Sequence, residues 1–341
     1  MADESIRPPD GEPGQYLKMP PWLDTETGAR RRVGVELEMN GLTLDDVAAR
    51  LARFVGGQAV AVGRYERAIK GDPAGDWIVE LDFALLKRLG RETYEDDGLA
   101  GELGRSAEEA LAWAAEQVVP VEVVSPPLPL ARLAQVEALI EMLREAGAQG
   151  SSASLVNAFG MQFNPEVPSR SPRVLAACLK AFLCLYDWLF ARADIDVSRR
   201  LTSYVDPFPL DYVRKVVAPG YWPDLPVLID DYLADNPTRN RALDMLPLFA
   251  ELDGARVRAV VDDELVKARP TFHYRLPDCE IHRADWGLHV AWNDWVEVER
   301  LAADEVRLAA CCAAYSSFLD QPLERWLGDW KAELERHWLT S

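Results

Sequence analysis

The sequence predicts an α+β fold built around an antiparallel sheet. Short segments in both halves of the chain alternate between apolar and polar residues, which is the pattern of strands with one buried face. Helical segments are interleaved with them, but without the regular strand–helix–strand rhythm of a parallel sheet. Of the 341 residues, 49% are hydrophobic, which is enough for a large core. We expect one domain over residues 26–341, preceded by a polar, mobile tail over residues 1–25.

The first half of the chain is expected to contain most of the strands. Thr43 is a suitable N-cap, Ser106 and Glu109 form a capping box, and Gly147 follows the end of a third helical pattern. The expected helices are Thr43–Phe54, Ser106–Gln117 and Leu130–Ala146, and the expected strands are Arg31–Asn40, Gln58–Val62, Tyr65–Lys70, Asp76–Phe83, Val118–Val124 and Leu155–Asn164.

The second half is expected to be mainly helical. Pro172 lies in the first turn of the most apolar stretch, where proline is tolerated. This stretch contains Lys180 and Asp187, so it indicates a buried helix and not a membrane span. The expected helices are Pro172–Arg192, Leu225–Leu233, Val257–Leu265, Asn293–Phe318 and Leu323–Trp338, and a last strand is expected at Thr271–Leu276.

Acidic side chains gather on one face of the early strands. Glu36 and Glu38 share the polar face of the first strand, Glu80 and Asp82 share that of a later one, and Glu122 lies opposite three valines. Carboxylates on neighbouring strands repel each other at roughly 5 Å unless protons or cations intervene. Hard divalent cations with oxygen ligands would relieve that repulsion. The alternative is an ordinary solvated sheet face, which is also polar.

Two later strands add other polar groups. Gln162 and Asn164 share one face, as do His273 and Arg275. The sequence contains no Walker-type phosphate loop, no dinucleotide fingerprint and no nucleophile elbow, so a nucleotide would have to bind on the sheet itself.

The composition excludes several classes of partner and site. A formal charge of −19 disfavours nucleic acids and anionic membranes. The five cysteines have neither zinc-site nor disulfide-framework spacing and indicate reduced thiols in a cytoplasmic protein.

Segments in a fixed order resemble the amidoligase family of the glutamine synthetase and glutamate–cysteine ligase superfamily. They are RRVGVELEMNGL, WIVELDFALLK, QVVPVEVVSPPLPL, ASLVNAFGMQFNPEVP, NPTRNRALDMLPLF, VKARPTFHYRLPDC and WNDWVEVERLAAD. The resemblance implies a curved antiparallel sheet that forms an active-site funnel, with helices on its outer face. It also implies an enzyme that uses ATP and Mg²⁺ to join small-molecule or peptide carboxylates to amines, and it leaves the oligomeric state open.

The resemblance also implies roles for individual residues. The expected metal ligands are Glu36, Glu38, Glu122 and His273, and one or more Mg²⁺ ions are expected. The expected catalytic residues are Asp82, Gln162 and Arg275, with a spare carboxylate (Asp82 or Glu80) accepting a proton from the amine. The expected nucleotide- or phosphate-binding residues are Asn164, Arg239, Arg241, Lys267, Arg269 and Arg275.

Two positions depart from the family pattern. Gln162 stands where a histidine is common, and it cannot carry a positive charge. His273 stands where a glutamate is common, and imidazole is a poorer ligand for Mg²⁺. Two alternatives therefore stay open: a non-catalytic binding descendant of the fold, and a metal-dependent phosphohydrolase that uses the same acids.

Overall fold

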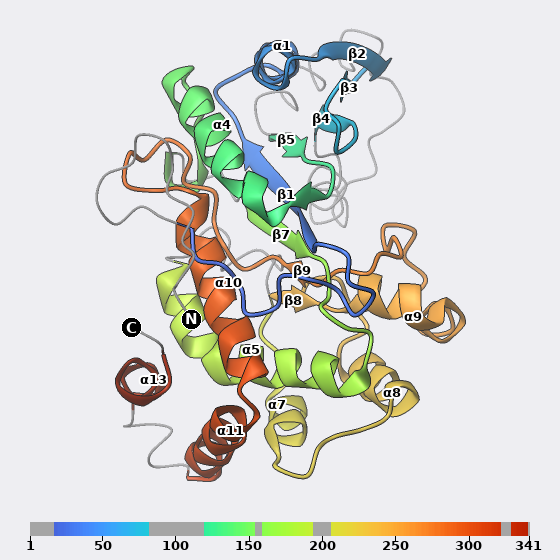
Figure 1. Ribbon diagram of the computed structural model, residues 1–341, viewed down its shortest axis with the longest axis vertical. Helices are drawn as coiled ribbons and strands as arrows, with labels where there is room; N and C mark the ends of the chain where they lie inside the picture. Colours follow the sequence, from blue (N-terminus) through green and yellow to red (C-terminus); the bar gives the residue numbers. More distant parts are fainter. Residues whose placement is uncertain (1–16, 82–118, 154–158, 194–205, 322–328, 340–341) are drawn as a thin grey trace, which may run out of the picture.

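One antiparallel sheet organises the computed structural model, which describes residues 17–81, 119–153, 159–193, 206–321 and 329–339. Its strand order is β2-β3-β4-β5-β1-β7-β9-β8, and β6 pairs with the start of β1. The sheet is open, with β2 and β8 at its edges, and helices surround it (Figure 1). The predicted α+β class is therefore correct, and the funnel implied by the resemblance stays a prediction.

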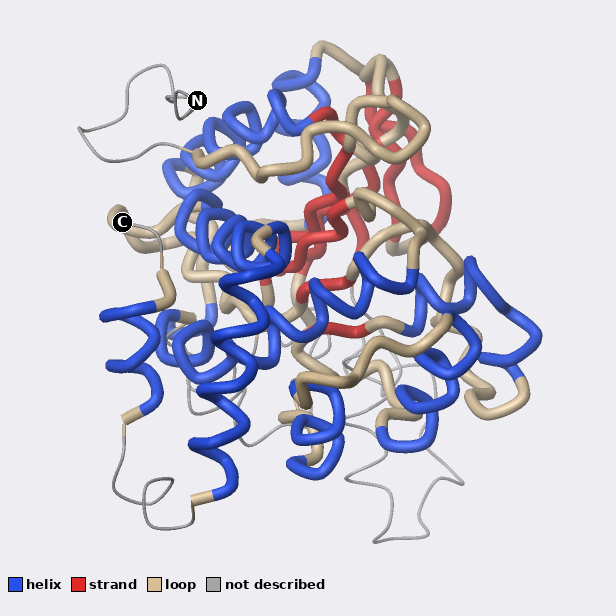
Figure 2. Tube along the Cα trace, turned by 60° about the horizontal axis from the view of Figure 1, so that its bottom comes forward, coloured by secondary structure: helices blue, strands red, loops and turns tan. Residues whose placement is uncertain are grey.

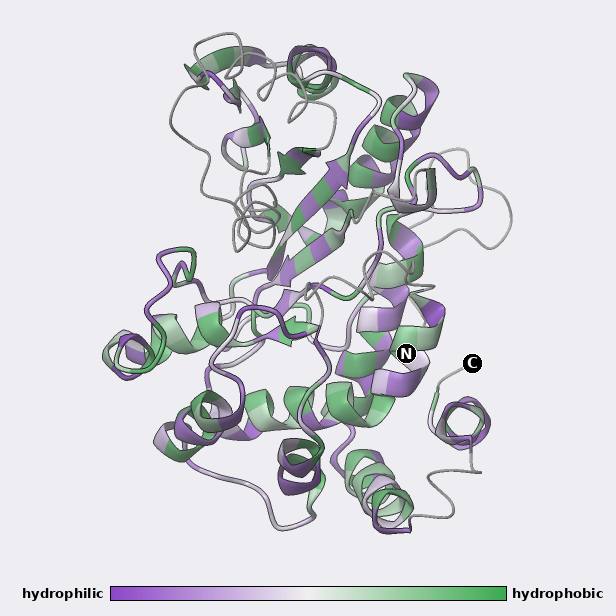
Figure 3. Cartoon of the chain, turned by 180° about the vertical axis from the view of Figure 1, so that it is seen from behind, coloured by the Kyte–Doolittle hydropathy of each residue, from purple (hydrophilic) through white to green (hydrophobic). Residues whose placement is uncertain are grey.

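The strands alternate as the sequence indicates. In β1 the side chains of Val33, Val35 and Leu37 are buried in the core, while Glu36 between them faces the other way. Figure 3 shows hydrophobic and hydrophilic residues alternating along the central strands. The strands are β1 (Arg32–Met39), β2 (Gln58–Gly63), β3 (Glu66–Lys70), β4 (Trp77–Leu81), β5 (Val121–Val124), β6 (Leu128–Pro129), β7 (Met161–Pro165), β8 (Leu243–Asp244) and β9 (His273–Tyr274).

The helices form a layer beside the sheet and a group at one end of it (Figure 2). Helix α1 packs on β3 and β4, while α10 packs against both α4 and α5. The helices are α1 (Leu44–Val55), α4 (Leu133–Glu145), α5 (Pro172–Arg192), α7 (Leu210–Val217), α8 (Leu225–Asp235), α9 (Leu246–Arg258), α10 (Leu288–Ala303), α11 (Glu305–Asp320) and α13 (Trp330–His337). Thr43 caps α1 as predicted, since its side chain accepts a hydrogen bond from the Asp46 amide.

Helix α5 has the predicted bounds and lies in the core. By length and composition alone it is long and apolar enough to cross a membrane, but 72% of its most apolar window is buried inside the protein. It packs against α7, α10, α11 and α13. The prediction that this segment is a buried helix is confirmed.

One buried ion pair and one partly buried ion pair join distant parts of the chain. The guanidinium of Arg31 donates to both carboxylate oxygens of Glu299 over 2.7 and 2.8 Å, and both side chains are almost fully buried. Arg132 likewise donates to both carboxylate oxygens of Asp72 over 2.6 and 2.7 Å. Both arginines therefore bind their partners bidentately.

The packed structure includes residues that the sequence assigns to the mobile tail. Leu17 is buried, the Lys18 amide donates to the Asn293 side chain, and the Trp292 indole donates to the Lys18 carbonyl. These contacts place the segment from Leu17 onward against α10.

Among the helices that the structure describes in full, two depart most from the prediction. The helix expected at Val257–Leu265 is replaced by α9, which begins at Leu246, with Pro247 in its first turn, and ends at Arg258. The residues after it form a loop that lines the cavity described below. The helix expected at Asn293–Phe318 is two helices, because Asp304 leaves the helical conformation and caps α11 by accepting from the Arg307 amide.

Some predicted elements lie wholly or partly outside the described residues. They are the helix Ser106–Gln117 and parts of Asp76–Phe83, Val118–Val124, Leu155–Asn164 and Leu323–Trp338.

Candidate functional site

A cavity of about 260 Å³ lies on the polar face of the sheet. We divide its lining into one wall from β1, β4, β5 and β7 and another from β8, β9 and the segments around Arg239 and Lys267; the two walls adjoin where β9 pairs with β7. Its charged and amide-bearing lining residues are Glu36, Glu38, Glu80, Glu122, Gln162, Arg239, Asp244, Lys267, Arg269, His273 and Arg275. Residues from most of the chain thus meet at one place.

Three glutamates of the cavity form a row across neighbouring strands, and Glu66 in β3, directly opposite Glu80, continues the row beyond the cavity lining. Glu122 in β5 is directly opposite Glu38 in β1 and directly opposite Glu80 in β4. We call these three residues the acid row. Directly opposed like charges are destabilising in an antiparallel sheet. The row is therefore an arrangement that a bound cation would stabilise.

Hydrogen bonds hold the two glutamates of β1 in place. Glu38 accepts from the Gly160 amide over 2.7 Å and from the Gln162 side-chain amide over 3.0 Å. Glu36 accepts from the Asn164 side-chain amide over 2.7 Å. Each carboxylate therefore has a defined orientation in the wall of the cavity.

His273 lies between Gln162 and Asp244. Its Nε2 is 2.7 Å from the Gln162 side-chain oxygen, and its Nδ1 is 3.4 Å from Asp244 Oδ2. Burial lowers the pKa of His273 well below its ordinary value, and the nearby cation of Arg275 lowers it further. Burial raises the pKa of Asp244 to about 6. These shifts disfavour an ion pair between the two groups.

Four cations line the other wall. Arg275 is buried and donates through Nη1 to the Arg239 carbonyl, and Nη1 of Arg269 lies 3.7 Å from Glu36 Oε1. Lys267 is exposed and makes no hydrogen bond or ion pair with any residue that the structure describes. We call Arg239, Lys267, Arg269 and Arg275 the cationic wall. Such a wall suits phosphate or carboxylate oxygens.

Most of the residues expected from the sequence meet here. Asn164 lies just behind the cavity and is hydrogen-bonded to Glu36. Arg241 does not line the cavity, because its guanidinium donates to the carbonyls of Pro207 and Asp235 and lies over the ring of Phe208. Asp82 lies outside the described residues.

Asp244 is a cavity residue that sequence reasoning missed. Its strand has only two residues, so no alternation marks it. The one local signal was its position after the basic NPTRNR segment and before Pro247, within a stretch that carries the resemblance.

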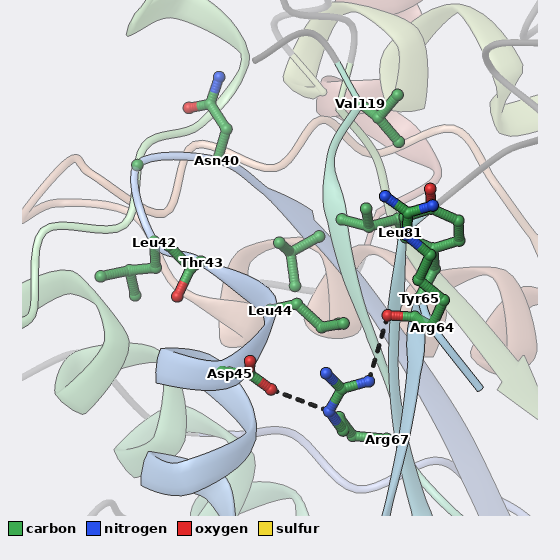
Figure 4. A pocket seen from close by; sticks show the side chains of 12 residues that line it. Asn40, Leu42, Thr43, Leu44, Asp45, Arg64, Tyr65, Arg67, Leu81 and Val119 are labelled. Atoms are coloured by element: carbon green, nitrogen blue, oxygen red, sulfur yellow. Dashed lines mark hydrogen bonds and ion pairs between the residues drawn. The ribbon is translucent and has the colours of Figure 1, made fainter. Parts of the chain in front are cut away.

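A larger cavity of about 620 Å³ lies just beyond the C-terminal end of β1, beside the start of α1 (Figure 4). Among its charged residues, Arg67 pairs with Asp45 over 2.8 Å, and Arg64 lies over the ring of Tyr65. Of the expected site residues that the structure describes, none lines it. We place the functional site in the smaller cavity, because the larger one lacks a comparable cluster of reactive groups.

The donor set of the smaller cavity fits a magnesium–nucleotide complex better than a preformed metal cage. Within the described parts of the chain, no group of three or more His, Cys, Asp or Glu side chains is arranged to hold a metal ion. Mg²⁺ is usually held by one or two carboxylates together with waters and phosphate oxygens, so it does not need such a group. The acid row supplies the carboxylates that this kind of binding needs, and the cationic wall suits the phosphate oxygens.

Comparisons with known proteins give one match. A family model described as "Putative amidoligase enzyme" matches residues 29–297, most of the chain. The comparisons with curated proteins and with solved structures find no match.

Proposed function

The chain belongs to this amidoligase family, and from that premise we propose that it is an ATP- and Mg²⁺-dependent ligase that joins a carboxylate to an amine. Family membership supports an amide-bond-forming ligase. The observation that supports the finer proposal is the cavity in which the acid row faces the cationic wall.

The reaction needs an energy source, because amide formation from a free carboxylate and an amine is uphill in water. In the proposed reaction a carboxylate oxygen of the substrate attacks the γ-phosphorus of ATP. An oxygen–phosphorus bond forms, the bond to the β-phosphate oxygen breaks, and ADP leaves. The amine then attacks the carbonyl carbon of the acyl phosphate, inorganic phosphate leaves, and the nitrogen loses a proton. Positioning and charge neutralisation supply most of the catalysis of phosphoryl transfer.

The acidic and the basic residues of the cavity have different roles in the proposed reaction. Glu38 and Glu122, with Glu36 beside them, would hold Mg²⁺, which when bound neutralises charge on the phosphate oxygens. Arg275 and Arg269 can each donate two parallel hydrogen bonds to phosphate oxygens. Their positive charge stabilises the negative charge on the transferring phosphoryl group. It therefore stabilises the transition state more than it stabilises the separated reactants.

A carboxylate at the edge of the acid row would accept the proton from the attacking amine. Glu80 lines the cavity and is the described residue placed for this role, while Asp82 stays a sequence-based candidate. The Gln162 amide is hydrogen-bonded to Glu38 and His273, so we assign it the role of positioning these side chains in the wall.

The experiment supplies purified protein with Mg-ATP, pooled amino acids and small peptides, and hydroxylamine. Hydroxylamine intercepts acyl phosphates as hydroxamates. The proposal predicts ADP and phosphate release that depends on a carboxylate, together with an amide or hydroxamate product. ADP release that needs no carboxylate and gives no amide would support a phosphohydrolase, and Mg-ATP binding without any turnover would support the binding descendant.

A further inference from the structure

We propose that His273 and Gln162 are positioning residues that fix the orientation of the Glu38 carboxylate for metal binding. This inference rests on the metal-binding part of the proposed function. It assigns His273 a role different from that of a metal ligand, and it gives Gln162 a role that follows from its own hydrogen bonds.

The three side chains form a continuous hydrogen-bonded chain across the sheet. His273 Nε2 lies 2.7 Å from Gln162 Oε1, and Gln162 Nε2 donates to Glu38 Oε1 over 3.0 Å. The chain runs from β9 through β7 to β1, which are neighbours in the sheet. The exposed fractions of the three residues are 6%, 7% and 9%, so water competes little for these bonds.

The hydrogen-bonding capacity of each group allows one arrangement. An ionised carboxylate only accepts hydrogen bonds, so Gln162 must direct its NH₂ group at Glu38. The Gln162 carbonyl oxygen then faces His273 and also only accepts, so the hydrogen of the imidazole must be on Nε2. Without the imidazole donor, the buried Gln162 carbonyl oxygen would lose its hydrogen-bond partner, and the amide that orients Glu38 would be held less firmly.

The other ring nitrogen of His273 is also directed at a protein atom. Nδ1 lies 3.4 Å from Oδ2 of Asp244, whose other oxygen accepts from the Leu246 amide at the start of α9. Asp244 is completely buried. With its hydrogen on Nε2, the imidazole has only a lone pair on Nδ1, and Nδ1 makes no hydrogen bond with Asp244. The Nε2 edge, which faces Gln162, is therefore the edge that is withheld from a metal ion.

Glu38 gains a fixed plane from this arrangement. Its Oε2 accepts from the Gly160 amide over 2.7 Å, so each carboxylate oxygen has one donor from the protein. Partners that orient a metal ligand typically contribute about 10–100-fold to metal affinity.

The test derives the apparent Kd for Mn²⁺ of the full chain from calorimetric titrations with ADP at a series of Mn²⁺ concentrations, because the proposed site includes phosphate oxygens among its ligands. His273→Leu removes the donor, while His273→Gln keeps a donor near the position of Nε2. We expect the Leu variant to raise the Kd for Mn²⁺ about 10–100-fold and the Gln variant to stay within about threefold of the natural protein. Tyr274→Phe, on the same strand but the opposite face, is the matched control and should leave the Kd unchanged.

A second variant keeps the test decisive if His273→Leu does not fold. Gln162→Met has a similar size and should weaken Mn²⁺ binding as much as His273→Leu, and the double variant should be no weaker than either single one. Equal Kd values for the Leu and Gln variants, additive effects in the double variant, or absence of Mn²⁺ binding by the natural protein would overturn the inference. Failure of the proposed ligase would show separately, as a protein that binds Mn²⁺ through Glu38 but forms no amide from ATP.

Discussion

Replacing the central carboxylate of the acid row should stabilise the protein when no metal is present. In Glu122→Gln, the residue opposite both Glu38 and Glu80 loses its charge but keeps its shape. Two cross-strand repulsions disappear together. Functional sites commonly carry such a cost in stability, because the arrangement suits a ligand better than it suits the empty protein.

The size of the gain follows from the register. Directly opposed side chains in an antiparallel pair are about 5 Å apart. At that distance and the dielectric constant of water, about 80, each pair of charges costs about 0.8 kcal/mol, so removing both pairs should gain at least about 2 kcal/mol. With an unfolding entropy of about 2.1 cal/mol/K per residue, a chain of 341 residues should melt about 3 °C higher.

Circular dichroism can follow thermal unfolding in EDTA and in excess Mg²⁺. The two conditions measure the stability of the protein without and with the metal ion. The natural protein should gain stability from Mg²⁺ by mass action, and Glu122→Gln should gain less. Glu166→Gln is the control, because Glu166 is paired with Arg32 outside the acid row and should keep the full Mg²⁺ effect. A lower melting temperature of Glu122→Gln in EDTA, or an undiminished Mg²⁺ effect, would refute the reasoning.

Three further predictions concern the cationic wall and the two ion pairs that join distant parts of the chain. The hydrogen bonds from Arg132 hold the pKa of Asp72 below its ordinary value, so the pair stabilises the fold fully above about pH 4 and progressively less as the pH falls towards the folded-state pKa. Urea unfolding should therefore show Asp72→Asn about 2–3 kcal/mol less stable at neutral pH, and the difference should shrink in acid. Glu299→Gln leaves Arg31 buried without its counter-charge and should lose about 3–5 kcal/mol in the same assay; a loss below about 1 kcal/mol would contradict the pairing. Lys267→Ala should change stability by less than about 0.5 kcal/mol yet weaken ATP binding in calorimetry, and unchanged affinity would remove Lys267 from the site.

The sequence predicts the local part of this structure well. The alternation of apolar and polar residues is a property of each strand alone, so Glu36, Glu38, Glu80 and Glu122 could be placed on polar faces without knowledge of the sheet. The bounds of α5 and the capping of α1 by Thr43 are local for the same reason. These elements need no information from distant residues.

The rest depends on contacts between distant segments. Strand order and register decide that Glu122 meets both Glu38 and Glu80, and no short stretch of sequence contains that information. Asp244 was missed because a two-residue strand shows no period. Arg241 was expected at the phosphate, but backbone carbonyls of Pro207 and Asp235 bind its guanidinium instead.

The role of His273 shows a further limit. Its place on a polar strand face was predicted correctly, and this position allows it either to ligate a metal ion or to donate a hydrogen bond. The registers of β1 with β7 and of β7 with β9 bring it near Gln162, which is directly opposite Glu36 and whose side chain donates to Glu38. The neighbours of an imidazole, and not its position in the sequence, determine which of its nitrogens is available.

Calorimetric titration with ATP, with and without Mg²⁺, tests the central claim most directly. The account predicts that ATP binds in the presence of Mg²⁺ and binds much more weakly in EDTA. It also predicts that the double variant Glu38→Gln with Glu122→Gln loses this dependence on Mg²⁺ while staying folded. Equal ATP affinity of the natural protein with and without Mg²⁺, or no binding in either condition, would contradict the assignment of the acid row and the cationic wall to a magnesium–nucleotide site.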